Sequence, residues 1–192
     1  MTRFWWVRHG PTHARTMVGW SDLPADLSDL AAIGRLRDYL PAGAAVISSD
    51  LSRAVSTADA VQRGPTRLPH DPDLREIHFG DWELRSHAEI AAEDGALARA
   101  FWERPGDICP PGGEGWNQLA ARVGRGIDRL IGVQPEGDVV VVAHFGAILA
   151  ALQQAQGMTA VEVFGQRIDP LSVTELAFDR GRWTVGRVNH CP

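Results

Sequence analysis

Two arginines and two histidines occur directly after short apolar runs of the chain. Arg8 and His9 follow the first run, Arg53 comes shortly after the second, and His144 follows the third. Arginine stays charged and offers a planar fork of donors that matches phosphate oxygens. A histidine with an ordinary pKa of about 6.5 is largely neutral near pH 7, so one ring nitrogen can attack phosphorus. These residue types predict phosphoryl transfer through a phosphohistidine.

The three apolar runs must position those side chains. They span Phe4 to Val7, Ala44 to Ile47 and Val139 to Ala143. Because they are continuous rather than alternating, they predict strands of a parallel sheet that is covered on both faces. In open parallel sheets, ligands bind beyond the carboxyl ends of the strands. We therefore expect the arginines and histidines to converge at one edge of the sheet.

Helical periodicity follows each run, which predicts an α/β fold with a mostly parallel central sheet. Ser49 and Asp50 are expected to cap the second helix. A turn at residues 179–181 predicts a hairpin near the end of the chain. The apolar helix faces comprise Leu30, Ile33, Leu36 and Leu40; Leu51, Ala54, Val55, Ala58 and Val61; Leu119, Val123, Ile127, Leu130 and Ile131; and Ile148, Leu149 and Leu152. We predict a single domain over 1–192, with a helical excursion at about 77–112.

Composition excludes several classes of function. The net charge of −5 gives no reason to expect a nucleic-acid surface, which needs a basic patch. All 19 basic residues are arginine. Without lysine, the chain has neither a Walker-type phosphate loop nor a pyridoxal Schiff base.

Cysteine usage and hydropathy indicate a reduced, cytoplasmic protein. Cys109 and Cys191 have no CxxC spacing, and the other histidines lack metal-ligand spacing, so we expect no disulfide, metal or cofactor. The apolar run before Arg8 is too short for a signal sequence. No stretch approaches the roughly 20 apolar residues of a membrane span, so no membrane partner is expected. The sequence does not decide whether the protein forms a homodimer.

Five blocks of the sequence resemble a known family. They are Arg8-His9-Gly10-Pro11-Thr12, Ser49-Asp50-Leu51-Ser52-Arg53-Ala54, Leu74-Arg75-Glu76-Ile77-His78-Phe79-Gly80-Asp81-Trp82-Glu83, Pro111-Gly112-Gly113-Glu114 and Val142-Ala143-His144-Phe145-Gly146. Their order and spacing resemble the histidine phosphatase superfamily, also called phosphoglycerate mutase-like proteins. The blocks around Glu76 and Trp82 look most like the branch of α-ribazole phosphatases and fructose-bisphosphatase-like members. The resemblance implies a three-layer α/β/α sandwich.

The resemblance also implies a role for each matching residue. His9 would be the nucleophile, Arg8 and Arg53 the phosphate clamp, and His144 the second phosphate-binding histidine. Glu76 would protonate the leaving alkoxide and then activate water. Proton donation by a positioned side chain is worth about 10²–10⁴-fold in rate.

Three positions depart from the family pattern and bear on the substrate rather than the reaction. The family usually has Glu, Gln or a similar residue where this chain has Pro11. Many members place an asparagine near the phosphate where this chain has Arg15, and many have a second glycine where this chain has Phe145. We expect Arg15 to add a positive contact and Phe145 to make the pocket tighter or more apolar. Thr12 and Trp82 are further candidate substrate contacts.

Several alternatives remain open from the sequence. Glu83 and Glu89 are carboxylates that could replace Glu76, and tryptophans 20, 82, 102 and 116 could be core residues or an aromatic pocket wall. The lead hypothesis is a metal-independent phosphomonoesterase of the histidine acid phosphatase type, acting on a small phosphorylated metabolite. A phosphoglycerate mutase-type phosphotransferase, a protein phosphohistidine phosphatase and a non-catalytic phospho-ligand binding domain are the alternatives.

Overall fold

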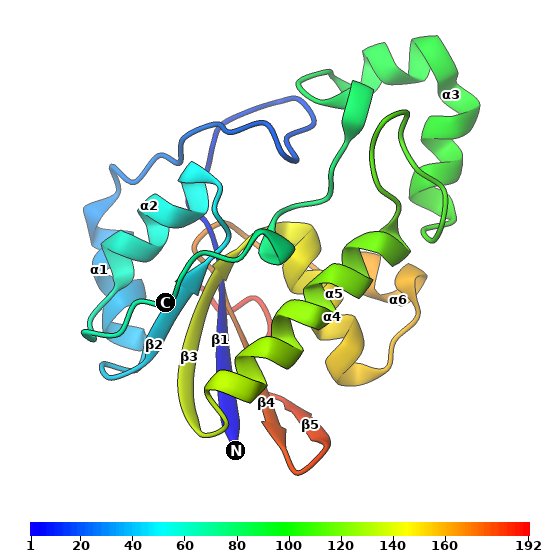
Figure 1. Ribbon diagram of the computed structural model, residues 1–192. Coiled ribbons are helices and arrows are strands. Elements are labelled where there is room, and N and C mark those ends of the chain that lie inside the picture. The colour runs from blue at the N-terminus through cyan, green and yellow to red at the C-terminus, as the bar shows by residue number, and fades with distance from the viewer.

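The computed structural model describes all 192 residues and contains a five-stranded sheet in the order β2-β3-β1-β4-β5 (Figure 1). The strands are β1 (Thr2–Arg8), β2 (Ala45–Ser48), β3 (Gly137–Ala143), β4 (Val173–Asp179) and β5 (Arg182–Val185). Strands β2, β3 and β1 run parallel, whereas β4 and β5 add an antiparallel edge. The three apolar runs therefore form the parallel centre of the sheet, and the C-terminal hairpin lies beside it, as predicted.

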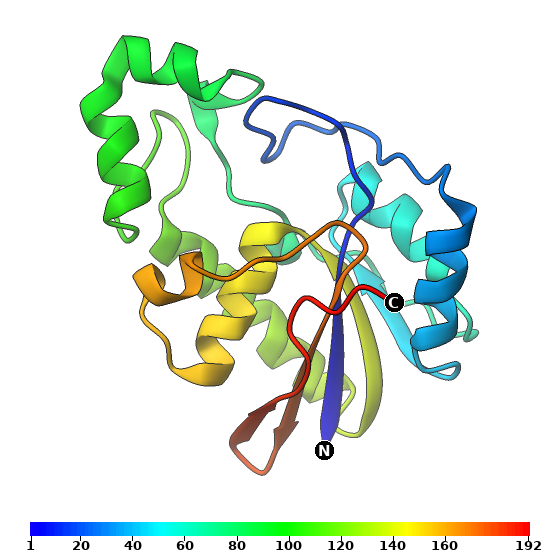
Figure 2. The ribbon, with the colours of Figure 1, turned by 180° about the vertical axis from the view of Figure 1, so that it is seen from behind.

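Helices cover both faces of the sheet, which confirms the three-layer α/β/α fold. They are α1 (Leu30–Tyr39), α2 (Ser52–Val61), α3 (His87–Glu103), α4 (Trp116–Val133), α5 (Phe145–Gln156) and α6 (Ala160–Phe164), with the short 3₁₀ helices η1 (Pro72–Leu74) and η2 (Gly80–Trp82). Helices α1 and α2 lie on one side of the sheet, and α4, α5 and α6 on the other (Figures 1 and 2).

Alternation along β3 explains why the apolar runs are continuous. Val139 and Val141 face the larger core cluster, which includes the apolar faces of α4 and α5. Val140 and Val142 face the smaller cluster, formed with α1 and α2. Since a strand points successive side chains to opposite faces, a strand buried on both faces needs an apolar residue at every position. Each such buried side chain contributes about 1.5–3 kcal/mol.

Two local predictions are wrong. Leu30, expected on the buried face of α1, is 76% exposed, because it is the first residue of the helix and lies clear of the sheet. The expected cap of α2 is also absent, since its N-cap is Leu51 with no side-chain hydrogen bond. Ser49 and Asp50 are instead hydrogen-bonded elsewhere, to His144 and to Arg75.

Helix α3 departs from the compact alternation of strands and helices. It begins with a capping box between Ser86 and Glu89 and bends at Asp94. Figure 1 shows α3 in green, beyond the carboxyl ends of the parallel strands. It therefore lies on the side of the sheet where ligands are expected. No helix of the chain has the length and apolar character needed to cross a membrane.

Candidate active site

The register of two parallel strands brings His9 and His144 together. Arg8 of β1 pairs with Ala143 of β3, so the next residue along each strand is a histidine. The backbone N–H of His9 donates to the carbonyl of Ala143 at 3.0 Å. The two imidazole centroids lie 5.0 Å apart, with 57° between the ring planes. The two imidazole rings are therefore neighbours at the carboxyl ends of β1 and β3.

The hydrogen bonds of His9 fix which ring nitrogen carries the proton. Its Nδ1 lies 2.7 Å from the carbonyl oxygen of Gly10, which can only accept, so Nδ1 is protonated and donates. Its Nε2 accepts a hydrogen bond from Arg53 Nε at 3.2 Å. Burial, together with the positive charge of Arg53, lowers the pKa of His9 to about 3. The ring is therefore neutral at pH 7, with its lone pair on Nε2.

His144 is fully buried behind His9 and is neutral in the free protein. Its Nε2 lies 2.7 Å from the Ser49 hydroxyl, which itself accepts from the backbone N–H of Leu51. With the hydroxyl as the donor to Nε2, the ring proton is on Nδ1, which has no partner in the protein. Burial, followed by the proximity of His9 and Arg53, lowers the pKa of His144 well below its ordinary value. A buried donor without a partner is costly unless a ligand accepts from it.

Arg8 and Arg53 are held in place by backbone carbonyl groups. Arg8 donates from Nη1 to Ile168 at 2.6 Å, while its buried Nε has no partner. Arg53 donates from Nη1 to Ser21 at 2.9 Å and from Nη2 to Gly19 at 2.6 Å. Backbone carbonyl groups fix the orientation of a guanidinium without neutralising its charge. Both arginines thus present positive charge to the region around His9.

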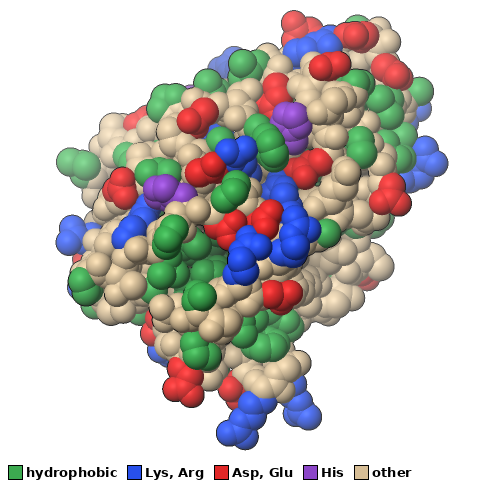
Figure 3. All heavy atoms as spheres, viewed as in Figure 1, with side chains coloured by type: hydrophobic (Ala, Val, Ile, Leu, Met, Phe, Trp, Pro, Cys, Tyr) green, Lys and Arg blue, Asp and Glu red, His purple; other side chains and the backbone are tan.

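Neither of these arginines forms an ion pair with a carboxylate. By contrast, Arg129 pairs with Asp71 and Asp73, and Arg75 pairs with Asp50. On the face drawn in Figure 3, basic side chains near the centre lie beside acidic ones. Buried positive charge without a direct ion-pair partner is a property of sites that bind anions.

Glu76 contributes a carboxylate to the same pocket as His9. Its side chain is 8% exposed, and Oε1 accepts from the backbone N–H groups of Ile77 at 2.9 Å and Gly146 at 3.0 Å. Gly146 lies in the first turn of α5, where a Cβ atom would meet Oε1 at 2.3 Å. Only glycine allows this helix terminus to approach the carboxylate so closely.

The pocket around these groups has a volume of about 320 Å³. Arg8, His9, Arg53 and Glu76 line it together with Thr12 and Phe145, and α3 adds His87 and Trp102. Three expected substrate contacts do not line the pocket. His144 is fully buried next to His9, which separates its ring from the pocket surface. Arg15 is exposed and does not line the pocket. Trp82 is 4% exposed and packs edge-on against Phe101 at 5.4 Å, in the core beneath α3.

Comparison with known proteins identifies the family. The model of the histidine phosphatase superfamily (branch 1) matches residues 4–190. The chain belongs to this superfamily.

Relatives of the chain include proteins that are named as phosphatases. The chain is 31% identical to the adenosylcobalamin/alpha-ribazole phosphatase of Escherichia coli, over 87% of this chain and 85% of that protein. It is 38% identical to the glucosyl-3-phosphoglycerate phosphatase of Mycobacterium tuberculosis, over 57% of this chain and 52% of that protein. It is also 33% identical to the bifunctional protein Rv2228c of M. tuberculosis, over 98% of this chain and 54% of that protein. The chain thus spans about half of the length of Rv2228c.

Solved structures of histidine phosphatases share the whole fold. Bacillus stearothermophilus YhfR superposes with a TM-score of 0.90 at 28% identity, covering 99% of this chain and 98% of that chain. The alpha-ribazole phosphatase of Shigella flexneri superposes with a TM-score of 0.85 at 28% identity, over 97% and 96% of the two chains. The superposition covers the strands and helices that hold the pocket.

The two alternative carboxylates lie outside the pocket. Glu83 accepts hydrogen bonds from Ser21, Trp20 and neighbouring backbone groups. Burial acts to raise the pKa of Glu83, but the Ser21 hydroxyl and the backbone N–H groups outweigh it and lower the pKa. Glu89 is exposed in the capping box of α3. Of the three, only Glu76 lines the pocket.

The tryptophans divide between core and pocket wall. Trp82 and Trp116 belong to the buried core, whereas Trp102 is 39% exposed and lines the pocket. Trp20 stacks near His78 and donates from Nε1 to the carbonyl of Glu76. Both of the expected roles for tryptophan are therefore present in the structure.

Sequence reasoning missed several residues that support the site. Thr57 accepts from the backbone N–H of Gly10 at 3.0 Å and donates to the carbonyl of Arg53 at 2.7 Å. Its spacing of four residues from Arg53 on one helix face was the available signal. Ser49 has the residue type of a helix cap, which hides its contact with His144, and the sequence gives no signal for Arg122. The chain has no group of three His, Cys, Asp or Glu side chains arranged to hold a metal, and the metal-independent course stays a prediction.

Protonation of His9 is expected to destabilise the fold as the pH falls. The pKa of His9 in the fold is about 3, below its ordinary value of 6.5, so the unfolded chain binds the proton at higher pH. Between these two values the unfolded state carries more protons, and stability falls as the pH decreases through this window. His144 acts in the same direction. Denaturation midpoints near neutral pH and near pH 4.5 would measure the loss. The His9→Gln variant should lose less stability on acidification than the wild type, and an equal loss would contradict this assignment.

Proposed function

We propose that this histidine phosphatase is a metal-independent phosphomonoesterase that transfers the phosphoryl group of a small phosphate monoester to His9 and then to water. One observation carries the proposal. The Nδ1–H of His9 is held by the Gly10 carbonyl, so the lone pair of a neutral imidazole is presented on Nε2, beside two arginines that form no direct ion pair with a carboxylate.

The first half-reaction forms the Nε2–phosphorus bond and breaks the ester bond from phosphorus to the leaving oxygen. Arg8, Arg53 and the unpartnered Nδ1–H of His144 stabilise the negative charge on the phosphoryl oxygens as it redistributes. Glu76 gives its proton to the leaving oxygen. The positive charge on the modified ring is stabilised by the bond from Nδ1–H to the carbonyl of Gly10.

The second half-reaction returns the site to its starting state. Glu76 takes a proton from water, the water oxygen bonds to phosphorus, and the bond from phosphorus to His9 Nε2 breaks. Inorganic phosphate leaves, Glu76 is again protonated, and the His9 imidazole is again neutral.

The pocket supports a small organic substrate. Its volume of about 320 Å³ accommodates a metabolite rather than a folded protein surface. Phe145 lies over the Arg8 guanidinium, with its ring centre 5.5 Å from Cζ, and Trp102 adds apolar surface from α3. The named activities of the relatives, α-ribazole phosphatase and glucosyl-3-phosphoglycerate phosphatase, are also those of phosphatases for small phosphorylated molecules.

Trapping the intermediate tests this proposal. The enzyme is mixed with p-nitrophenyl phosphate carrying radiolabelled phosphorus and quenched in alkali within one turnover. We expect protein-bound label that is stable to alkali, labile to acid and located on the His9 peptide. The Glu76→Gln variant should retain more label, since the water step then lacks its base. Label that survives acid, or a burst of product without bound label, would contradict the proposal. Transfer of label to a second hydroxyl of the substrate would indicate a phosphotransferase.

A further inference from the structure

Glu76 lies on a segment that has no regular secondary structure. Residues 75–79 connect η1 to η2, and none of them belongs to a helix or strand. Buried backbone N–H and C=O groups outside helices and strands must be paired by other means. The position of Glu76 therefore depends on whichever side chains provide that pairing.

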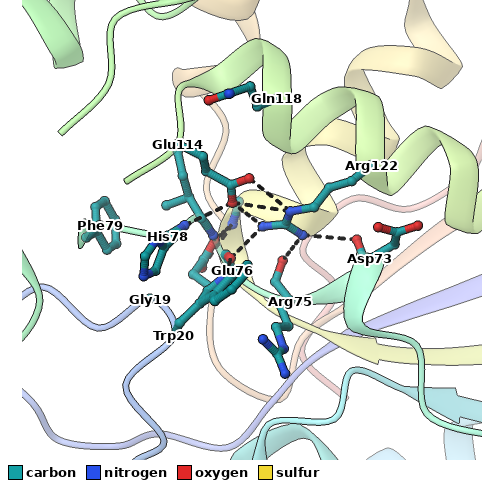
Figure 4. A network of polar contacts seen from close by, with 12 residues as sticks. Gly19, Trp20, Asp73, Arg75, Glu76, His78, Phe79, Glu114, Gln118 and Arg122 are labelled. Carbon is teal, nitrogen blue, oxygen red and sulfur yellow. Dashed lines mark hydrogen bonds and ion pairs between the residues drawn. The ribbon is translucent and has the colours of Figure 1, made fainter. Parts of the chain in front are cut away.

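Arg122 of α4 provides most of the hydrogen bonds to the backbone around Glu76. Its guanidinium has five N–H donors, and all five are used (Figure 4). Nη1 donates to the carbonyl groups of Asp73 at 3.0 Å and Arg75 at 2.7 Å. Nη2 donates to the carbonyl of Glu76 at 2.6 Å. The remaining donors, one on Nη2 and one on Nε, are directed to Glu114.

Glu114 connects Arg122 to the other end of the segment. Its carboxylate accepts from the backbone N–H of His78 at 2.9 Å, and its own N–H donates to the carbonyl of His78 at 2.9 Å. The side chains of Arg122 and Glu114 are only 8% and 14% exposed. Together they hold the backbone on both sides of Glu76.

Neither member of this pair lines the pocket, so neither is placed to contact the substrate. Their hydrogen bonds nonetheless hold the backbone of Glu76, which does line the pocket. Arg122 holds the Glu76 carbonyl from α4, while Gly146 holds the Glu76 carboxylate from α5. Helices α4 and α5 pack against each other. Proton transfer requires heavy atoms within about 2.6–3.2 Å, so a small shift of this backbone would separate the carboxyl from the leaving oxygen.

We propose that Glu114 and Arg122 are a positioning pair that sets Glu76 in place for proton transfer to the leaving group. This inference rests on the proposed function, because it assumes that Glu76 is the proton donor. The pair acts through Glu76 and contributes nothing to binding of the phosphoryl group. Lysine cannot replace Arg122 fully, since an ammonium has three donors and no planar fork.

Two substrates of nearly equal shape isolate this effect. p-Nitrophenyl phosphate releases a phenolate that needs little protonation, whereas p-nitrobenzyl phosphate releases an alkoxide that needs it. The ratio of the benzyl rate to the phenyl rate therefore reports proton donation. We expect Arg122→Lys to lower this ratio by about tenfold and Arg122→Gln to lower it further. Arg125→Gln is the matched control, because Arg125 lies on the same helix but reaches only the Asp73 carboxylate, at 3.3 Å. Its ratio should equal that of the wild type.

A double variant separates positioning from general structural damage. In a Glu76→Gln background, Arg122→Lys should cause no further fall in the ratio, since the proton donor is already absent. If the Arg122 variants do not fold, Glu114→Gln takes their place. It keeps the side-chain volume and an acceptor for Arg122, and it should lower the ratio of the benzyl rate to the phenyl rate by a smaller factor. Folded Arg122 and Glu114 variants that keep the wild-type ratio would overturn the positioning role, as would a further fall in the double variant. If Glu76→Gln itself keeps the wild-type ratio, the role of Glu76 in the proposed function fails instead.

Discussion

Replacing His9 by alanine is expected to lower turnover of p-nitrophenyl phosphate by at least about 10³-fold while the fold is retained. In the proposed mechanism the variant removes the attacking atom, His9 Nε2. Arg8 and Arg53 keep their bonds to backbone carbonyl groups, and Arg53 loses only its bond to the His9 ring. His9 lies at the pocket surface rather than within either apolar core cluster, so its loss should not disrupt packing. Steady-state rates and circular dichroism, measured together, check both parts of the expectation.

A second histidine variant controls for nonspecific effects. His70 is exposed on the segment that connects α2 to η1, and it does not line the pocket. His70→Ala should keep wild-type turnover. Substantial turnover by folded His9→Ala would remove His9 as the nucleophile and require direct attack by water.

The change Glu76→Gln should produce the second large effect, and its size should depend on the leaving group. For p-nitrobenzyl phosphate, we expect a loss of about 10²–10⁴-fold, because an alkoxide leaves poorly without a proton. For p-nitrophenyl phosphate, the loss should be smaller, because a phenolate leaves with little assistance. The glutamine can still accept from the N–H of Gly146, so the pocket should keep its shape. Rates with both substrates measure the difference.

Glu89→Gln provides the carboxylate control, since Glu89 is an exposed residue of the α3 capping box. Its rates on both substrates should match those of the wild type. Equal losses on both substrates in Glu76→Gln would argue that Glu76 supports structure or binding rather than proton transfer.

The parallel centre of the fold could be predicted from the sequence because burial on both faces leaves a readable pattern. The run from Val139 to Ala143 has no polar residue, and few structures other than a doubly covered strand require this. Local details were less predictable. Leu30 fits the helical period but lies at the start of α1, where periodicity does not report how far the sheet extends. Ser49 has the right residue type for a helix cap, yet the tertiary contact with His144 takes its hydroxyl.

The site was predictable to the extent that its residues follow strands. His9 and His144 each come directly after a core strand, so their convergence follows from parallel pairing alone. Glu76 lies on an irregular segment without periodicity, and only the family resemblance indicated it. Arg15 and Trp82 have residue types that suit a substrate contact, but the sequence outside regular strands and long helices does not determine the direction of a side chain. The contacts of Arg122 depend on how α4 packs against a distant loop, which a linear pattern does not encode.

The placement of each histidine one residue beyond its strand couples chemistry to strand alignment. A slip of β1 against β3 by one position would move one ring about 3.3 Å along the sheet and turn its side chain to the opposite face. Such a misfolded chain could keep its secondary structure and much of its compactness, yet its two imidazoles would no longer share a ligand. Recovery of turnover during refolding would therefore serve as an assay of correct strand alignment, and it would distinguish native molecules from compact mispaired ones that spectroscopy counts as folded.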